Sequence, residues 1–276
     1  MVSLECKVQN LMNNDYPGLL LNVDPRGIAT VTLNRPEIHN AFDADLISTL
    51  TQVFKRLDQD ETVRVVILAS RGKSFSAGAD LNWMQAMANY SYAENLTDAK
   101  ALADMLWSLN NLSKPTIARV QGATFGGAVG LIACCDMAIG SKLSKFCLSE
   151  VKIGLVPATI SPYVIDAIGA RAARRYFTTA EVFSAHRARR LGLLSEAVTE
   201  EELDSTINGL IEHILRNSPQ AVSAAKQLIF KVQNRVIESE LVHLSCEEIA
   251  KIRVSSEGQE GLQAFLQKRP ASWIKD

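Results

Sequence analysis

The order of apolar patterns between residues 19 and 70 constrains the fold of this chain more than any other feature. Two strand-like segments, LLLNVD (19–24) and GIATVTLN (27–34), flank a turn signal at Pro25-Arg26-Gly27. Residues 43–60 then repeat apolar side chains at helical spacing, and RVVILAS (64–70) is typical of a buried strand. The order strand, strand, helix, strand predicts an α/β fold.

The rest of the pattern predicts an α/β core followed by helices. Further strands are expected at 114–122, 137–141 and 145–150, and helices at 94–109 and after the glycines of 122–130. Beyond Leu155 helical patterns dominate, at 162–168, 170–177, 201–216 and 219–254. We therefore predict a core over residues 1–198 and a helical C-terminal region over residues 199–276.

Charge and cysteine content argue against several classes of protein. With 29 basic and 30 acidic residues, the chain has no general attraction for nucleic acid. No apolar run reaches the ~20 residues of a membrane helix, and the N-terminus resembles neither a signal nor a transit peptide. Five cysteines without a C-x-x-C pair, and four scattered histidines, predict neither disulfides nor a metal site. We expect a soluble, cytoplasmic protein with neither a nucleic-acid nor a membrane partner.

Two glycine-containing turns each follow a predicted strand: FSAGAD (75–80) and GATFGGAVG (122–130). Small residues at such points let the backbone approach a ligand closely. If Gly126 and Gly127 open the next helix, free backbone N–H groups point outward there. Two N–H groups from separate loops could form an oxyanion hole, although ordinary strand-to-helix turns would have the same pattern.

Glu150 stands in a mostly apolar run, FCLSEVKIGLVPA (146–158). A carboxylate is costly to bury unless something is arranged around it. An apolar setting would raise the pKa of Glu150 towards the working pH, which suits proton exchange. A solvated glutamate at a strand end, with Lys152 as its partner, is the alternative interpretation.

Five motifs, in this order, make the sequence resemble the enoyl-CoA hydratase/isomerase (crotonase) superfamily over essentially the whole chain: LNRPEIHNAF, GKSFSAGADL, VQGATFGGAVGLIACCD, FCLSEVKIGLVPA and ARRLGLLSEAV. The ending GLQAFLQKRPASW is also similar to that family. Within the family, SAGADLNWM and SEVKIGLVPATISPYV resemble bacterial methylglutaconyl-CoA hydratases of leucine breakdown. Enzymes that act on carboxygeranoyl-CoA are similar.

The resemblance implies repeated ββα units in the core and a helical C-terminal oligomerisation region, in a homotrimer or a dimer of trimers. The substrate would be an acyl-CoA thioester, so that coenzyme A is part of the substrate and no other cofactor is needed. The resemblance assigns an oxyanion hole to the backbone N–H groups of Ala79 and Gly127, and acid/base catalysis to Glu150. The other substrate-binding residues expected from it are Ala77, Asp80, Leu81, Gly126, Gly130, Phe265 and Lys268.

Several of these residues also have structural interpretations. Asp80 could cap a helix while it orders the oxyanion loop. Phe265 and Lys268 could be a packing aromatic and a solvated lysine. Trp83 and Met84 either line an acyl pocket or pack within a helix, and the sequence leaves both interpretations open.

Gly130 is a departure from the family pattern, because hydratases of the family usually carry a second glutamate at this position. Either Glu150 serves both proton-transfer roles, or another polar group or the substrate's own carboxylate holds the water. We expect Gly130 to make room for a carboxylated acyl group. The sequence thus predicts a hydratase of a branched, carboxylated enoyl-CoA, such as methylglutaconyl-CoA in leucine degradation. The alternatives are an enoyl-CoA isomerase, which needs only one base, a carboxygeranoyl-CoA hydratase, and a non-catalytic binding protein.

Overall fold

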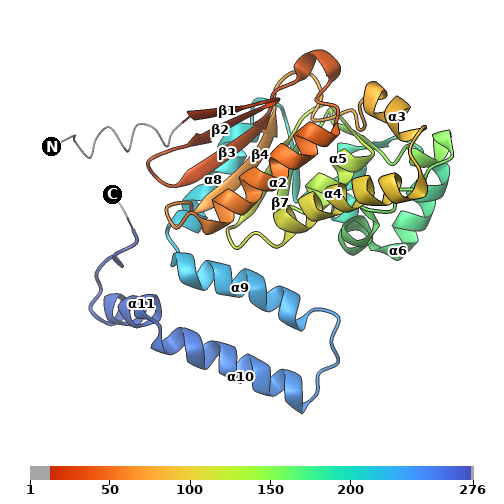
Figure 1. The fold of residues 1–276 in the computed structure, drawn as a ribbon. Coiled ribbons are helices and arrows are strands. Elements are labelled where there is room, and N and C mark those ends of the chain that lie inside the picture. The colour runs from red at the N-terminus through yellow and green to blue at the C-terminus, as the bar shows by residue number, and fades with distance from the viewer. Residues whose placement is uncertain (1–12, 275–276) are drawn as a thin grey trace. The chain divides into compact units, whose positions relative to one another are not determined.

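The computed structural model describes residues 13–274, which contain a seven-stranded sheet (Figure 1). Much of the N-terminal segment in which no signal peptide was expected lies outside the described residues, as does Cys6. In sheet order, the strands are β1 (Asn13–Tyr16), β2 (Leu19–Val23), β3 (Ile28–Leu33), β4 (Val65–Ser70), β5 (Thr116–Val120), β7 (Met137–Ser141) and β10 (Glu196–Val198). Strands β1, β2 and β3 pair antiparallel, and every pair from β3 to β10 is parallel.

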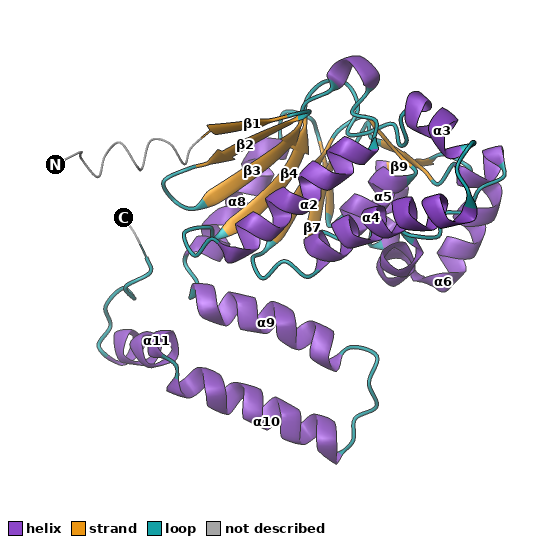
Figure 2. Ribbon diagram, in the orientation of Figure 1, coloured by secondary structure: helices purple, strands orange, loops and turns teal. Residues whose placement is uncertain are grey.

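Helix α2 (Ala44–Gln59) covers one face of this sheet (Figure 1, Figure 2). Asp43 caps the helix by accepting a hydrogen bond from the backbone N–H of Leu46, at 2.8 Å. The apolar residues that share the inner face of α2 are Leu46, Ile47, Leu50, Val53, Phe54 and Leu57, and all of them are buried. The helical period of the sequence therefore lays a continuous apolar stripe into the core, and the α/β fold is confirmed.

A three-stranded sheet brings two of the singled-out segments together. It consists of β6 (Ala123–Phe125), β8 (Lys145–Cys147) and β9 (Phe183–Ser184). β6 and β8 are parallel, so their carboxyl ends meet at the same edge of the sheet. Because β6 leads into Gly126 and β8 leads towards Glu150, both site segments start from this edge.

The remaining helices are η1 (Pro36–Ile38), α3 (Leu81–Met87), α4 (Tyr92–Asn110), α5 (Gly127–Ala133), η2 (Glu150–Ile153), α6 (Ser161–Thr179), α7 (Ala185–Leu191), α8 (Leu203–Leu215), α9 (Pro219–Val232), α10 (Ser239–Val254) and α11 (Ser256–Leu266).

Two expectations about these elements need correction. The strand expected at 145–150 ends at Cys147, and Glu150 begins η2. The helix expected over 219–254 is interrupted after Val232, where Asn234 takes a left-handed conformation with φ 59°.

The described chain divides into two compact units, residues 13–112 with 116–207 and residues 113–115 with 208–274. The division falls inside α8 rather than at residue 198, because the first turns of α8 belong to the core. Leu203 and Ile207 are buried there, and Asp204 forms an ion pair with Arg119 of β5. No helix in the described range is long and apolar enough to cross a membrane.

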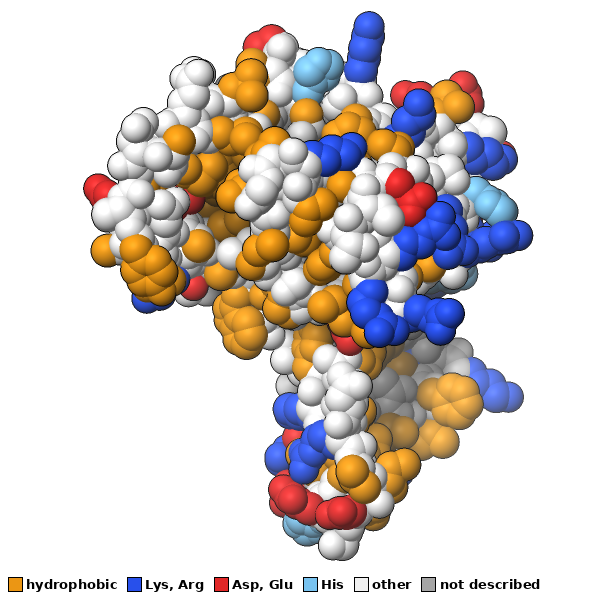
Figure 3. Space-filling model, turned by 90° about the vertical axis from the view of Figure 1, so that its right-hand side faces the viewer, with side chains coloured by type: hydrophobic (Ala, Val, Ile, Leu, Met, Phe, Trp, Pro, Cys, Tyr) orange, Lys and Arg blue, Asp and Glu red, His pale blue; other side chains and the backbone are white. Residues whose placement is uncertain are grey.

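The second unit contains α9, α10 and α11. Lys226 on α9 is buried and donates a hydrogen bond to the carbonyl of Lys114, and Glu260 on α11 pairs with Arg269. Large hydrophobic side chains are nevertheless exposed on this unit (Figure 3), among them Ile229, Ile237, Val254, Phe265 and Leu266. These helices therefore present apolar surface that their own packing does not cover.

Candidate active site

A cavity of about 380 Å³ lies within the first unit. Its polar lining residues are Asn95, Asp98, Glu150 and Thr159. Its other lining residues are apolar or glycine: Phe42, Ala79, Trp83, Met87, Ala99, Leu102, Gly127, Leu155, Val156, Pro157, Ala158 and Ile160. A mostly apolar wall with a few polar groups is typical of a site for a small molecule. The cavity thus brings together Ala79, Gly127 and Glu150, the three residues singled out for the chemistry.

The pairing of the loop around Ala79 with Phe42 turns the N–H group of Ala79 away from Phe42. Phe42 donates its N–H to the carbonyl of Gly78 at 2.7 Å, and its carbonyl accepts from the N–H of Asp80 at 2.8 Å. Neighbouring residues of an extended chain point their N–H groups to opposite sides, so the N–H of Ala79 points away from Phe42. Among the described residues this N–H has no hydrogen-bond partner.

Gly127 is the first residue of α5, and its N–H group is also unpaired. The first N–H groups of a helix have no acceptor within that helix, and no described residue accepts from Gly127. The neighbouring N–H of Gly126 instead donates to the carbonyl of Cys147 at 2.8 Å, which ties the turn to β8. Two residues with unpaired backbone N–H groups therefore line the same cavity.

Glu150 is a partly buried carboxyl group. Burial raises its pKa, and a hydrogen bond from its own backbone opposes this rise only in part. Its Oε2 atom is buried and has no hydrogen-bond partner within residues 13–274. Leaving a buried carboxylate oxygen unpaired costs free energy, which argues against a purely structural role. Glu150 is also not a strand end, and the Nζ atom of Lys152 lies 4.0 Å from Sγ of Cys147 instead of pairing with Glu150.

Gly126 keeps the backbone close to this carboxyl group. Its φ of 55° and ψ of −126° lie in a region that strains any L side chain. A Cβ atom on this residue would also lie 3.3 Å from Oε1 of Glu150. Gly126 does not line the cavity, so its part in the site is the tight approach of the turn to Glu150.

The structure contradicts the expected role of Gly130. This residue is buried within α5 and does not line the cavity. A Cβ atom on Gly130 would lie only 2.2 Å from Cγ2 and 2.6 Å from Cβ of Ile160. Ile160, which is 2% exposed, thus fills the space of a side chain at position 130 and itself lines the cavity. The glycine makes room for an apolar wall and not for a carboxylated acyl group.

Three further residues expected to bind substrate lie in the loop before α3 or at the first position of that helix, and none of them lines the cavity. Ala77 donates its N–H to the carbonyl of His39, and Leu81 is 75% exposed. Asp80 is the N-cap of α3, where its carboxylate accepts from the N–H groups of Asn82 and Trp83. Asp80 therefore orders the loop that presents Ala79, which combines both interpretations considered for it.

The residues expected near the C-terminus belong to the second unit, where Phe265 and Lys268 are both exposed. They are therefore not among the residues that form the cavity of the first unit. Of the two α3 residues considered for an acyl pocket, Trp83 lines the cavity and Met84 does not.

Sequence reasoning missed Phe42, Asp98 and Ile160 as lining residues. Asp98 lies inside a predicted helix, where no local pattern indicates which polar residue faces a cavity. A signal for Ile160 was present in the sequence, because the family that the chain resembles often has glycines after the proline of this motif, whereas this chain has Ala158-Thr159-Ile160. That replacement accompanies the change at Gly130, and Ile160 is in contact with Gly130.

Comparison with known proteins agrees with this architecture. The family model described as enoyl-CoA hydratase/isomerase matches residues 24–276. The crystal structure of an enoyl-CoA hydratase from Shewanella pealeana is 43% identical, with a TM-score of 0.91 over 98% of this chain and 100% of that chain. A Legionella pneumophila structure assigned to enoyl-CoA hydratase/isomerase (crotonase) is 47% identical, with a TM-score of 0.88 over 93% of this chain and 99% of that chain. A Thermus thermophilus protein assigned as an enoyl-CoA hydratase is 30% identical over 251 residues, 91% of this chain and 99% of the relative. The chain therefore belongs to the enoyl-CoA hydratase/isomerase (crotonase) family.

Proposed function

We propose that this protein hydrates an α,β-unsaturated acyl-CoA thioester, with Glu150 as its acid/base. The supporting observation is that two unpaired backbone N–H groups and one unpartnered carboxylate oxygen belong to residues of one cavity. In this proposal Ala79 and Gly127 donate to the thioester carbonyl oxygen. Negative charge grows on that oxygen as water adds, and one preorganised donor typically stabilises such charge by about 2.7–4 kcal/mol.

A single carboxyl group can balance the protons of this addition. Water attacks the β-carbon while Glu150 takes one of its protons, and the π electrons move onto the thioester oxygen. The resulting enolate then takes the proton from Glu150 at its α-carbon, which restores the carboxylate and the carbonyl. The raised pKa of Glu150 suits both steps, because the group takes up and releases a proton closer to neutral pH.

An enoyl-CoA isomerase is the second candidate, and the contact between Gly130 and Ile160 favours it. Isomerisation moves a proton between two carbon atoms of the acyl chain, so it needs neither water nor a second carboxyl group. Ile160 fills the space in which hydratases of this family usually carry their second glutamate.

The absorbance of the conjugated enoyl thioester distinguishes the two reactions. Hydration of crotonyl-CoA lowers this absorbance, whereas isomerisation of a β,γ-enoyl-CoA raises it. We expect a decrease with crotonyl-CoA, and a loss of at least ~10²-fold in rate for Glu150→Gln. Acyl-CoA binding should persist in this variant, because glutamine keeps the side-chain volume. Glu61→Gln, which changes an exposed glutamate outside the cavity, is the matched control and should keep the full rate.

Two outcomes would contradict this proposal. Near-normal hydration by Glu150→Gln would mean that another residue performs the proton transfers. Binding of acyl-CoA without turnover in either assay would instead support a non-catalytic binding protein.

The narrower resemblance supports methylglutaconyl-CoA or carboxygeranoyl-CoA as the substrate, but the cavity wall does not. Among the described residues that line the cavity, none is a lysine, arginine or histidine that could pair with an acyl carboxylate. We therefore favour an uncharged acyl group. A turnover screen with crotonyl-CoA, methylglutaconyl-CoA and carboxygeranoyl-CoA tests this, and a preference for methylglutaconyl-CoA would support the carboxylated substrate instead.

We also propose that the second unit carries the interface of a homotrimer or a dimer of trimers. Its exposed apolar side chains support this, since exposed hydrophobic surface commonly marks association sites. A monodisperse monomer in sedimentation at micromolar concentration would contradict it. The proposed reaction needs no cofactor besides the coenzyme A of the substrate, and a cytoplasmic location stays a prediction.

A further inference from the structure

We propose that Asp98 sets the acyl specificity of the cavity by repelling enoyl thioesters whose acyl chain carries a carboxylate. This inference rests on the proposed function, because it concerns the acyl group of the same substrate. It assigns selectivity to a residue that takes no part in the proton transfers.

Asp98 is held in the cavity wall by a neighbouring side chain. It lies on α4, is half-buried, and lines the cavity together with Asn95 and Leu102 from adjacent turns of the same helix. Its Oδ1 atom accepts a hydrogen bond from the indole Nε1 of Trp83 at 3.0 Å, and Trp83 lines the cavity too. A carboxylate held in this way cannot easily turn out of the wall when an acyl chain enters.

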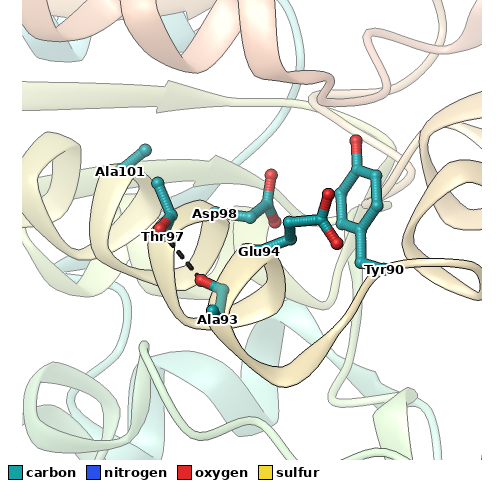
Figure 4. Close-up of a pocket in the computed structure, with 6 residues that line it drawn as sticks. All are labelled: Tyr90, Ala93, Glu94, Thr97, Asp98 and Ala101. Carbon is teal, nitrogen blue, oxygen red and sulfur yellow. Dashed lines mark hydrogen bonds between the residues drawn. The ribbon is translucent and has the colours of Figure 1, made fainter.

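The negative charge continues on the other side of Asp98. A second, more open hollow is lined by Tyr90, Ala93, Glu94, Thr97, Asp98 and Ala101 (Figure 4), and all of these except Tyr90 belong to α4. Glu94 accepts hydrogen bonds from the hydroxyl and the backbone N–H of Ser91, which lower the pKa of Glu94. Asp98 belongs to both hollows, so the carboxyl group of Glu94 adds a second negative charge to the surroundings of Asp98.

No cation offsets these charges within the described lining. The residues that line the cavity or the open hollow include no lysine, arginine or histidine. The charged residues there are Glu150, Asp98 and Glu94, all of them acidic. Because most of the cavity wall is apolar, it screens charge less effectively than water does. An acyl carboxylate would therefore meet only like charges.

The size of this effect follows from Coulomb's law. Two like charges roughly 6 Å apart, at an effective dielectric constant of about 40, change a dissociation constant by about tenfold. A neutral acyl chain of the same shape escapes this penalty. The cavity should thus show a preference for uncharged acyl groups that the replacement of Asp98 removes.

Binding of saturated acyl-CoA thioesters tests the inference independently of turnover. Glutaryl-CoA carries a terminal carboxylate, and an analogue with an isopropyl group in its place has a similar shape without the charge. Calorimetry gives the Kd of both for the wild type, Asp98→Asn and Asp104→Asn. Asparagine keeps an oxygen that can accept from Trp83. Asp104 is exposed on the same helix and does not line the cavity, so its variant controls for the change in net charge.

The wild type and Asp104→Asn should bind the neutral analogue at least about tenfold more tightly than glutaryl-CoA. Asp98→Asn should reduce this ratio by about tenfold. Equal binding of both ligands by the wild type, an unchanged ratio in Asp98→Asn, or no binding of either ligand would overturn the inference. A failure of the proposed function has a different signature, because the binding ratio would persist while crotonyl-CoA is not turned over.

Discussion

Replacing Gly130 by alanine should destabilise this protein, although alanine is the better helix former. The new Cβ atom would lie 2.2 Å from Cγ2 and 2.6 Å from Cβ of Ile160, which is itself buried. Overpacking of a core typically costs ~1–3 kcal/mol. Exchanging glycine for alanine inside a helix gains up to about 1 kcal/mol. We therefore expect Gly130→Ala to lower the free energy of unfolding by up to about 2 kcal/mol.

A second background isolates the contact. Ile160→Gly removes both close atoms and leaves the Cα atom of residue 160 at 3.6 Å, an ordinary distance. In that background Gly130→Ala should be neutral or stabilising by up to about 1 kcal/mol. The effect of the alanine should thus differ by ~1–3 kcal/mol between the two backgrounds. Ile160→Ala retains the Cβ atom at 2.6 Å and should give only a partial rescue.

Urea-induced unfolding of these variants measures the difference. All proteins are compared at one concentration, because the stability of an oligomer depends on it. An equal cost of Gly130→Ala in both backgrounds would refute the conclusion that Ile160 fills this space. Gly130→Glu would place its Cβ atom against the same two atoms of Ile160. We expect it to reduce turnover of neutral and carboxylated substrates alike, in contrast to an effect of charge.

Three further predictions concern the site. Glu150→Gln should raise the free energy of unfolding at neutral pH, because burial disfavours the carboxylate. The folded protein binds the carboxyl proton of Glu150 more tightly than the unfolded chain does, so wild-type stability falls as the pH rises from 4.5 through the raised pKa. Urea unfolding at several pH values should therefore show that the stability advantage of the variant disappears in acid. Gly126→Ala should lower the free energy of unfolding by ~1–3 kcal/mol in urea and should lower turnover. The control is Gly154→Ala, because Gly154 has φ 79° but no atom within 4 Å of its Cβ position; it should cost about 1 kcal/mol and leave turnover unchanged. Loss of turnover in both variants would contradict a specific role for Gly126. Asp80→Ala should cost ~0.5–2 kcal/mol through loss of the α3 cap, and an unchanged urea midpoint would show that the cap is dispensable.

The sequence alone determined the features that depend on near neighbours along the chain. The apolar face of α2 and the buried strands β3 and β4 follow from periodicity, since a helix or strand repeats its direction every few residues. The glycines before α5 indicated a close backbone approach, and the structure has one at Gly126. The apolar run around Glu150 likewise indicated a carboxyl group with a raised pKa.

Only the tertiary structure decided the features that depend on packing between distant segments. Ile160 fills the space beside Gly130, thirty positions earlier in the chain, and this contact turned an expected opening into an apolar wall. Trp83 fixes Asp98 in the cavity from another helix, which no helical period can indicate. The direction of the Ala79 N–H depends on the pairing of its loop with Phe42. In each case the deciding contact joins side chains or backbone groups that become neighbours only when the core has formed.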